Sequence, residues 1–138
     1  MLGVVTGGER ELSAQECWAL LARGWLGRVA LTANALPIVV PVEYCVTGDE
    51  LALCLGRHDI PARRLVDAVV GFATDFVDDA TREGWTVHVQ GTTRLADAHV
   101  TCATHEQAQI VFLVPAVVTG QTLQLCPFGR DLLTGPAQ

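Results

Sequence analysis

A cluster of cationic side chains marks the stretch of this sequence best suited to binding chemistry. The cluster comprises Arg57, His58, Arg63 and Arg64. Between them, Asp59 can cap a helix and Pro61 suits its first turn. The free N–H groups of a helix N-terminus and the helix dipole both favour a bound anion. The segment therefore predicts an anion site on a short helix, and the alternative is that Arg63 and Arg64 form a solvated helix face.

A proline inside a predicted strand marks a second candidate binding position. Pro41 lies in the run Ile38 to Val46, whose alternation predicts a strand with two apolar faces. Proline has no N–H group to donate to a neighbouring strand, so the backbone is open there, and a flat ligand could lie against it. The alternative is an edge-strand proline that binds nothing.

The remaining reactive side chains form no catalytic arrangement. His88 lies in the middle of a predicted strand, and no carboxylate or cysteine has the spacing from it that a catalytic pair would need. We therefore interpret His88 as a polar cross-strand neighbour. The five cysteines are scattered, and no two have the spacing of a zinc or dithiol site. Four of them are flanked by apolar or small residues, which predicts small buried side chains in a reducing compartment.

Composition limits the classes of partner. Half of the 138 residues are hydrophobic and 17% are charged. One domain of this length leaves part of this apolar surface exposed, and we expect a homodimer to bury it. A net charge of −6 without any lysine argues against nucleic acid. The chain shows neither an apolar run that spans a bilayer nor a signal-peptide pattern, so we expect a soluble, cytoplasmic protein without membrane contact.

Alternating apolar residues predict six strands that position these side chains. Three form an antiparallel meander within residues 27–55, with turns at Asn34-Ala35 and Thr47-Gly48-Asp49. The others are Val70–Val77, Trp85–Leu95 and Gln121–Phe128. Closing these strands into a barrel removes the apolar edges that they would otherwise expose.

Three helices are expected to accompany the strands. The first begins at the capping box Ser13–Glu16 and ends at Gly24. A short helix ends near Ala68, and another runs from Thr101 to about Val114, where Pro115 ends it. We therefore predict a mostly β, six-stranded antiparallel barrel with an N-terminal capping helix and short connecting helices, in which residues 1–11 form an arm and residues 12–138 a single domain.

Short motifs in a fixed order carry a family resemblance. They are Glu16-Cys17 with Leu20-Leu21, Gly27-Arg28-Val29-Ala30, Pro37 with Val40-Pro41-Val42-Glu43-Tyr44, Phe72 with residues 75–79, residues 80–87 with Val89-Gln90-Gly91, and Pro127 with Thr134-Gly135. In this order the chain resembles the split barrel of the pyridoxamine 5′-phosphate oxidase-like superfamily that binds flavin mononucleotide (FMN), in its short single-domain branch. The resemblance covers about residues 12–135.

The resemblance implies a homodimer with FMN bound in the clefts between subunits and a small-molecule substrate. The flavin would lie against the second and third strands, with its ring and ribityl chain lined by Pro41, Val42, Cys54, Leu55 and Gly56. Trp85 would approach the ring from the loop before the fifth strand. The phosphate would lie in the short-helix region, where the cations Arg57, His58, Arg63 and Arg64 are available.

The chain departs from the family at the expected phosphate grip. Asp59-Ile60-Pro61 stands where relatives carry a Gly-Ser-Lys-type element, so the usual hydroxyl and ammonium donors are missing. Either the nearby cations bind the phosphate, or the protein binds flavin weakly, binds something else or has lost the cofactor. The hypotheses are an FMN-dependent oxidoreductase of unassigned substrate, a deazaflavin-dependent reductase, and a cofactor-free binding protein. Pyridoxamine phosphate oxidase activity itself is not expected, since that enzyme is a longer chain with additional substrate-binding arginines.

Overall fold

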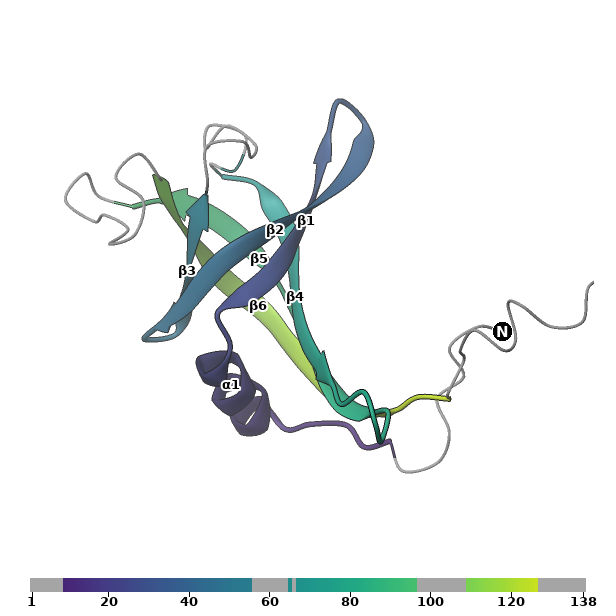
Figure 1. Cartoon of the computed structure of the whole chain (residues 1–138). Coiled ribbons are helices and arrows are strands. Elements are labelled where there is room, and N and C mark those ends of the chain that lie inside the picture. The colour runs from purple at the N-terminus through teal and green to yellow at the C-terminus, as the bar shows by residue number, and fades with distance from the viewer. Residues whose placement is uncertain (1–8, 56–64, 66, 97–108, 127–138) are drawn as a thin grey trace, which may run out of the picture.

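The barrel predicted from the sequence is confirmed in a computed structural model, which describes residues 9–55, 65, 67–96 and 109–126. The strands form a closed antiparallel barrel in the order β1-β2-β3-β6-β5-β4. The elements are α1 (Ala14–Arg23), β1 (Leu26–Ala33), β2 (Leu36–Thr47), β3 (Glu50–Leu55), β4 (Val69–Val77), β5 (Glu83–Leu95) and β6 (Gln109–Gln124). Figure 1 shows α1 at the end of the barrel where β1 begins, and the β1–β2 hairpin projecting at the opposite end.

Helix α1 begins and ends where its sequence signals predict. The backbone N–H of Glu16 donates to the Ser13 hydroxyl at 3.1 Å, and the N–H of Ser13 donates to the Glu16 carboxylate at 3.0 Å. Leu21 is fully buried on the face that packs against the barrel. Gly24 ends the helix with an extended backbone, and a Cβ atom there would collide with the Tyr44 hydroxyl. Glycine is thus required at this position for space and not for a left-handed conformation.

One face of every strand fills the barrel interior. β3 shows the alternation most clearly, because Leu51, Leu53 and Leu55 are buried while Ala52 and Cys54 on the other face are half-buried. The remaining strand residues of the core are Val29, Leu31, Val42, Tyr44, Val70, Phe72, Val87, Val89, Val111 and Leu113. Side chains therefore fill the interior, and a ligand site has to lie at a rim or on an outer face.

The last strand corrects one prediction. β6 starts at Gln109 and not at Gln121, so the residues up to Val114 are strand, where the sequence predicts a helix. Pro115 ends no helix and lies beside a bulge in the β5–β6 ladder. Phe112 on the outer face of this stretch lies under the Arg94 guanidinium, 4.5 Å from the ring centroid. A strand covered on both faces carries apolar residues at every position, and periodicity alone does not separate it from a buried helix.

Parts of both predicted connecting helices lie outside the described residues. These parts are residues 56–64, residue 66 and residues 101–108. Within the described residues, no helix has the length and apolar character that crossing a bilayer requires.

The end of the N-terminal arm adds to the sheet beside β6. The N–H of Leu12 donates to the Gly120 carbonyl at 2.9 Å, and the N–H of Thr122 donates to the Arg10 carbonyl at 2.8 Å. Arg10 also forms an ion pair with Glu16 at 2.8 Å, so the arm is attached to both β6 and α1.

Candidate functional site

The structure places Pro41 and Cys54 on the outer face of the sheet, on neighbouring strands. Pro41 is paired with Arg28 of β1, and Cys54 is paired with Glu43, two residues after Pro41. Pro41 is exposed, whereas Cys54 is half-buried. Small or apolar side chains on this face are Ala30, Val39, Pro41, Ala52 and Cys54, and we call them the outer strip. The charged residues Arg28 and Glu43 lie on the same face, as the direct partners of Pro41 and Cys54. The strip residues are uncharged, and the two charged side chains flank them.

Val42 and Leu55, which the resemblance also assigns to the flavin ring and ribityl chain, have side chains that point into the barrel. Val42 is 2% exposed and Leu55 is 3% exposed, and both side chains belong to the core. A ligand on the outer strip would therefore meet Pro41 and Cys54 through their side chains, but Val42 and Leu55 only through main-chain atoms.

The predicted phosphate site falls outside the described residues. It consists of Arg57, His58, Arg63 and Arg64, and Gly56, which the resemblance assigns to the flavin ring and ribityl chain, lies outside the described residues as well. The described residues that follow are held to β5 by Thr93, whose hydroxyl donates to the Leu65 carbonyl and accepts the N–H of Ala68 at 3.1 Å. Leu65 itself is fully buried. The Thr93 hydroxyl thus holds Leu65 and Ala68 beside β5.

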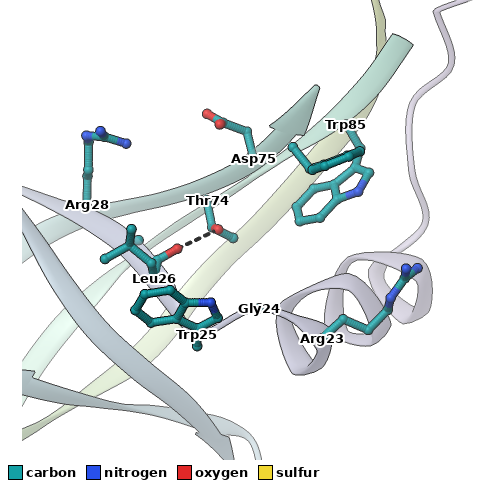
Figure 2. A pocket seen from close by; sticks show the side chains of 10 residues that line it. Arg23, Gly24, Trp25, Leu26, Arg28, Thr74, Asp75 and Trp85 are labelled. Carbon is teal, nitrogen blue, oxygen red and sulfur yellow. Dashed lines mark hydrogen bonds between the residues drawn. The ribbon is translucent and has the colours of Figure 1, made fainter. Parts of the chain in front are cut away.

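Trp85 lies in a separate pocket at the α1 end of the barrel (Figure 2). We call this cavity of about 390 Å³ the rim pocket. The side chains that give it its character are Arg23, Trp25, Arg28, Asp75, Phe76 and Trp85. Its lining includes neither Pro41 nor Cys54, so Trp85 does not join the outer strip within one chain. Arg28 connects the two places, since it lines the rim pocket and is paired with Pro41.

Sequence reasoning missed the other residues of the rim pocket. Trp25 follows the helix stop at Gly24 and precedes the alternation of β1, so no apolar pattern accounts for it. A large aromatic residue in such a linker is a signal that could have been used. Arg28 and Asp75 gave no comparable signal, because polar residues on the outer face of a strand are ordinary.

His88 and the cysteines show no reactive arrangement. A ring nitrogen of His88 lies 3.0 Å from the Thr86 hydroxyl on the exposed face of β5. Cys17 is buried, and burial raises the pKa of its thiol. The prediction of buried cysteines is wrong for Cys45 and Cys126, which are exposed. Among the described residues, no group of three or more His, Cys, Asp or Glu side chains could hold a metal ion.

The closed barrel of six antiparallel strands with one capping helix defines the split-barrel class of proteins. The shortest strand pairing in this barrel is that of β1 with β4, which covers residues Arg28 to Ala30 of β1. A sequence model described as pyridoxamine 5′-phosphate oxidase matches residues 13–119. The chain belongs to the pyridoxamine 5′-phosphate oxidase family, as its motifs predict.

Known proteins share this fold and part of this sequence. The uncharacterized protein Rv0080 of Mycobacterium tuberculosis is 36% identical over 89 residues, which are 59% of this chain and 57% of that protein. The FAD binding protein from Mycobacterium smegmatis is 26% identical, with a TM-score of 0.68 over 84% of this chain and 99% of that one. An FAD-binding protein from Mesorhizobium loti, 19% identical, has a TM-score of 0.65 over 83% and 96% of the two chains and shows the fold alone.

Proposed function

We propose that this protein is a flavin-binding split barrel of oxidoreductase type, and that it acts as a homodimer with its cofactors in the clefts between subunits. The outer strip is the observation that carries the proposal. Membership of the family and 26% identity to the FAD binding protein from Mycobacterium smegmatis support it. The substrate is a small molecule whose identity the strip does not define.

The outer strip fits a planar heterocycle. Ala30, Ala52 and Cys54 carry short side chains, which leave the strand backbone close to the surface. Pro41 and Val39 add exposed apolar surface, and Val39 is 61% exposed. Ligand sites are mostly apolar with few polar groups, and the strip has this character. A bound flavin would supply hydride transfer, while these side chains bind the ring, orient it and exclude water from one of its faces.

Exposed apolar side chains on the outer faces support the homodimer. Val39, Val69 and Val117 point away from the core and are 61%, 79% and 46% exposed. Exposed apolar side chains are common at protein interfaces. A second copy packed on the outer faces would cover it and would turn the open strip into a cleft. Size-exclusion chromatography with light scattering tests this, and a monomer at every protein concentration would contradict it.

FMN is the flavin expected from the sequence, and FAD is the second candidate because the Mycobacterium smegmatis relative is described as binding FAD. The visible spectrum of the purified protein, followed by separate titrations with FMN, FAD and a deazaflavin, tests the assignment. Binding of FMN or FAD supports a flavoprotein, whereas binding of the deazaflavin alone would favour the reductase hypothesis. Failure to bind any of them at tens of micromolar would leave a cofactor-free binding protein.

A further inference from the structure

The ladder between β1 and β4 ends before either strand does. It covers Arg28–Ala30 of β1 and Gly71–Ala73 of β4, while β1 continues to Ala33 and β4 begins at Val69. Beyond the ladder, β1 continues beside β2 as a two-stranded hairpin that projects from the barrel (Figure 1). Each of the two strands therefore has a stretch of edge that the other does not cover.

Main-chain groups of both edges face the space between them. Successive residues of an antiparallel strand turn their N–H and C=O groups to alternate sides. Because the Trp25 carbonyl accepts the N–H of Tyr44 on β2, odd-numbered residues of β1 and even-numbered residues of β2 face each other, and Thr32 faces β4. Since the Ala68 carbonyl accepts an N–H group of β5, Val69 faces β1. The register would place Thr32 opposite Val69, but the two are not paired, and we call the space between them the edge gap.

A cavity of about 450 Å³ adjoins the edge gap. Its lining includes Leu31 and Thr32 of β1, Pro37 of β2 and Val69 of β4, and contains no charged residue. Val69 is 79% exposed, so apolar surface is available to a ligand there. An extended peptide matches this combination, because its main chain can bond to a strand edge while alternate side chains enter a pocket.

The opposite edge of the same hairpin is protected against strand addition. Pro37, Val39 and Pro41 are odd-numbered residues of β2 and face the side that β3 does not reach, since the β2–β3 ladder starts at Glu43. The two prolines have no N–H group to donate, and proline at an exposed edge discourages pairing with another strand. β1 contains no proline, so Thr32 keeps both of its main-chain groups. The free edge of β1 is therefore the one open to an added strand.

Charge favours a basic flank on such a peptide. The chain carries a net charge of −6, and Asp67, two residues before Val69, is exposed. A lysine beside the apolar part of the peptide would be attracted to this surface and a glutamate repelled, with the modest energy of an exposed charge pair.

We propose that the edge gap binds an extended, apolar peptide segment with a basic flank, which adds a strand to β1 at Thr32 and places an apolar side chain against Val69. The added strand lies in the plane of the sheet, so it does not compete with a dimer that packs on the outer faces. Binding requires no flavin, and the inference therefore goes beyond the proposed function.

Backbone amide signals of ¹⁵N-labelled protein offer a direct test. The probe is the peptide acetyl-Lys-Val-Thr-Val-amide, and its match carries an N-methyl group on the threonine nitrogen, which removes one donor. The probe is expected to shift the signals of Thr32, Val69 and Gly71 saturably and to leave that of Gly48, in the turn between β2 and β3, in place. The N-methylated peptide and a peptide with glutamate in place of lysine are each expected to bind several-fold more weakly.

A pair of proline variants tests which edge is used. Thr32→Pro removes an N–H group that faces the gap and leaves the β1–β2 ladder its bonds, so we expect binding to weaken about threefold to tenfold, the loss of one hydrogen bond. Val39→Pro removes an N–H group from the opposite edge of the hairpin and should leave the peptide affinity unchanged.

Four outcomes would overturn the proposal. They are equal affinity for the N-methylated peptide, equal effects of Thr32→Pro and Val39→Pro, the absence of a saturable shift, and a Thr32 signal that moves with protein concentration alone. The last outcome would assign the edge to a second copy of the chain. Failure to bind the peptide would leave the flavin titrations unaffected, so the two proposals fail independently.

Discussion

The hydroxyl of Tyr44 on β2 lies 2.6 Å from the carbonyl oxygen of Leu21 in the last turn of α1 and donates a buried hydrogen bond to it. The N–H of Tyr44 also donates to the Trp25 carbonyl at 2.9 Å. The last carbonyl groups of a helix have no partner inside the helix, and here a strand residue supplies one. Burial raises the pKa of Tyr44, so the hydroxyl keeps its proton at neutral pH. One residue thus fixes the wall of the rim pocket between α1 and β1.

Replacing Tyr44 by phenylalanine tests this hydrogen bond alone. The ring would keep its edge-to-face contact with Phe72, in which the centroids are 4.9 Å apart. The Leu21 carbonyl would still accept the N–H of Gly24 at 3.2 Å, so we expect the free energy of unfolding to fall by about 1 kcal/mol and not more. Urea unfolding followed by circular dichroism measures the change. Unaltered stability would show that the hydroxyl contributes nothing.

The effect of Gly24→Ala on the free energy of unfolding should depend on the residue at position 44. In the native protein the added methyl group would meet the Tyr44 hydroxyl, whereas the next ring atom is 3.4 Å away, an ordinary contact. We expect Gly24→Ala to lower the free energy of unfolding by about 1–3 kcal/mol in the native background, as overpacking does. In a Tyr44→Phe background its effect should be clearly smaller. A double-mutant cycle measures this coupling, and strictly additive effects would contradict the collision.

The Glu16 carboxylate makes part of the stability depend on pH. The hydrogen bond from Arg10 and the backbone N–H of Ser13 lower the pKa of Glu16 to about 2 from an ordinary value of 4.5. A carboxyl group with a lowered folded-state pKa stabilises the fold above its unfolded-state pKa and loses this contribution as the pH falls through the folded value. Glu16→Gln should therefore unfold at lower urea concentration than the native protein at pH 7. The difference should shrink between about pH 4.5 and about pH 2; a difference that stays constant would count against the ion pair.

Local signals allowed much of the fold to be predicted. The capping box fixed the start of α1 because both of its hydrogen bonds lie within four residues. Asn34 and Ala35 turn the β1–β2 hairpin with φ values of 52° and 65°, the positive values that the sequence signal at Asn34 indicates. Alternation also gave the buried faces of β3 and β5, because one face of each lies in the core.

Non-local pairing limited prediction of the rest. Whether the residues after Gln109 form a helix or a strand depends on their hydrogen-bonded partners in β3 and β5, which lie along the two edges of β6. The rim pocket depends on the short pairing of β1 with β4 and on the bond from Thr74 to Leu26. Those residues are 48 positions apart in the sequence, so spacing alone gave no sign of their contact.

The Thr93 hydroxyl should help to hold Leu65 and Ala68 beside β5. This hydroxyl is buried and bonds to both Leu65 and Ala68. Thr93→Val keeps the shape of the side chain but leaves these backbone groups short of a partner, so we expect a loss of about 1–3 kcal/mol in the free energy of unfolding. Thr92→Val on the exposed face is the matched control, with an expected change within about 0.5 kcal/mol. Equal effects of the two variants in urea unfolding would contradict this role.

The paired substitution Arg63→Ala and Arg64→Ala tests where a flavin phosphate would bind. If these side chains hold the phosphate, the double variant should lose about 2 kcal/mol of FMN binding, or about thirtyfold in affinity, since hydrogen bonds to charged groups are of this size. Riboflavin has the same ring but no phosphate, so its affinity should stay the same. Fluorescence quenching of each ligand gives both values, and Arg94→Ala controls for the general loss of positive charge. An equal loss for FMN and riboflavin would mean that the arginines support the fold of the site, and unchanged affinity for FMN would place the phosphate elsewhere.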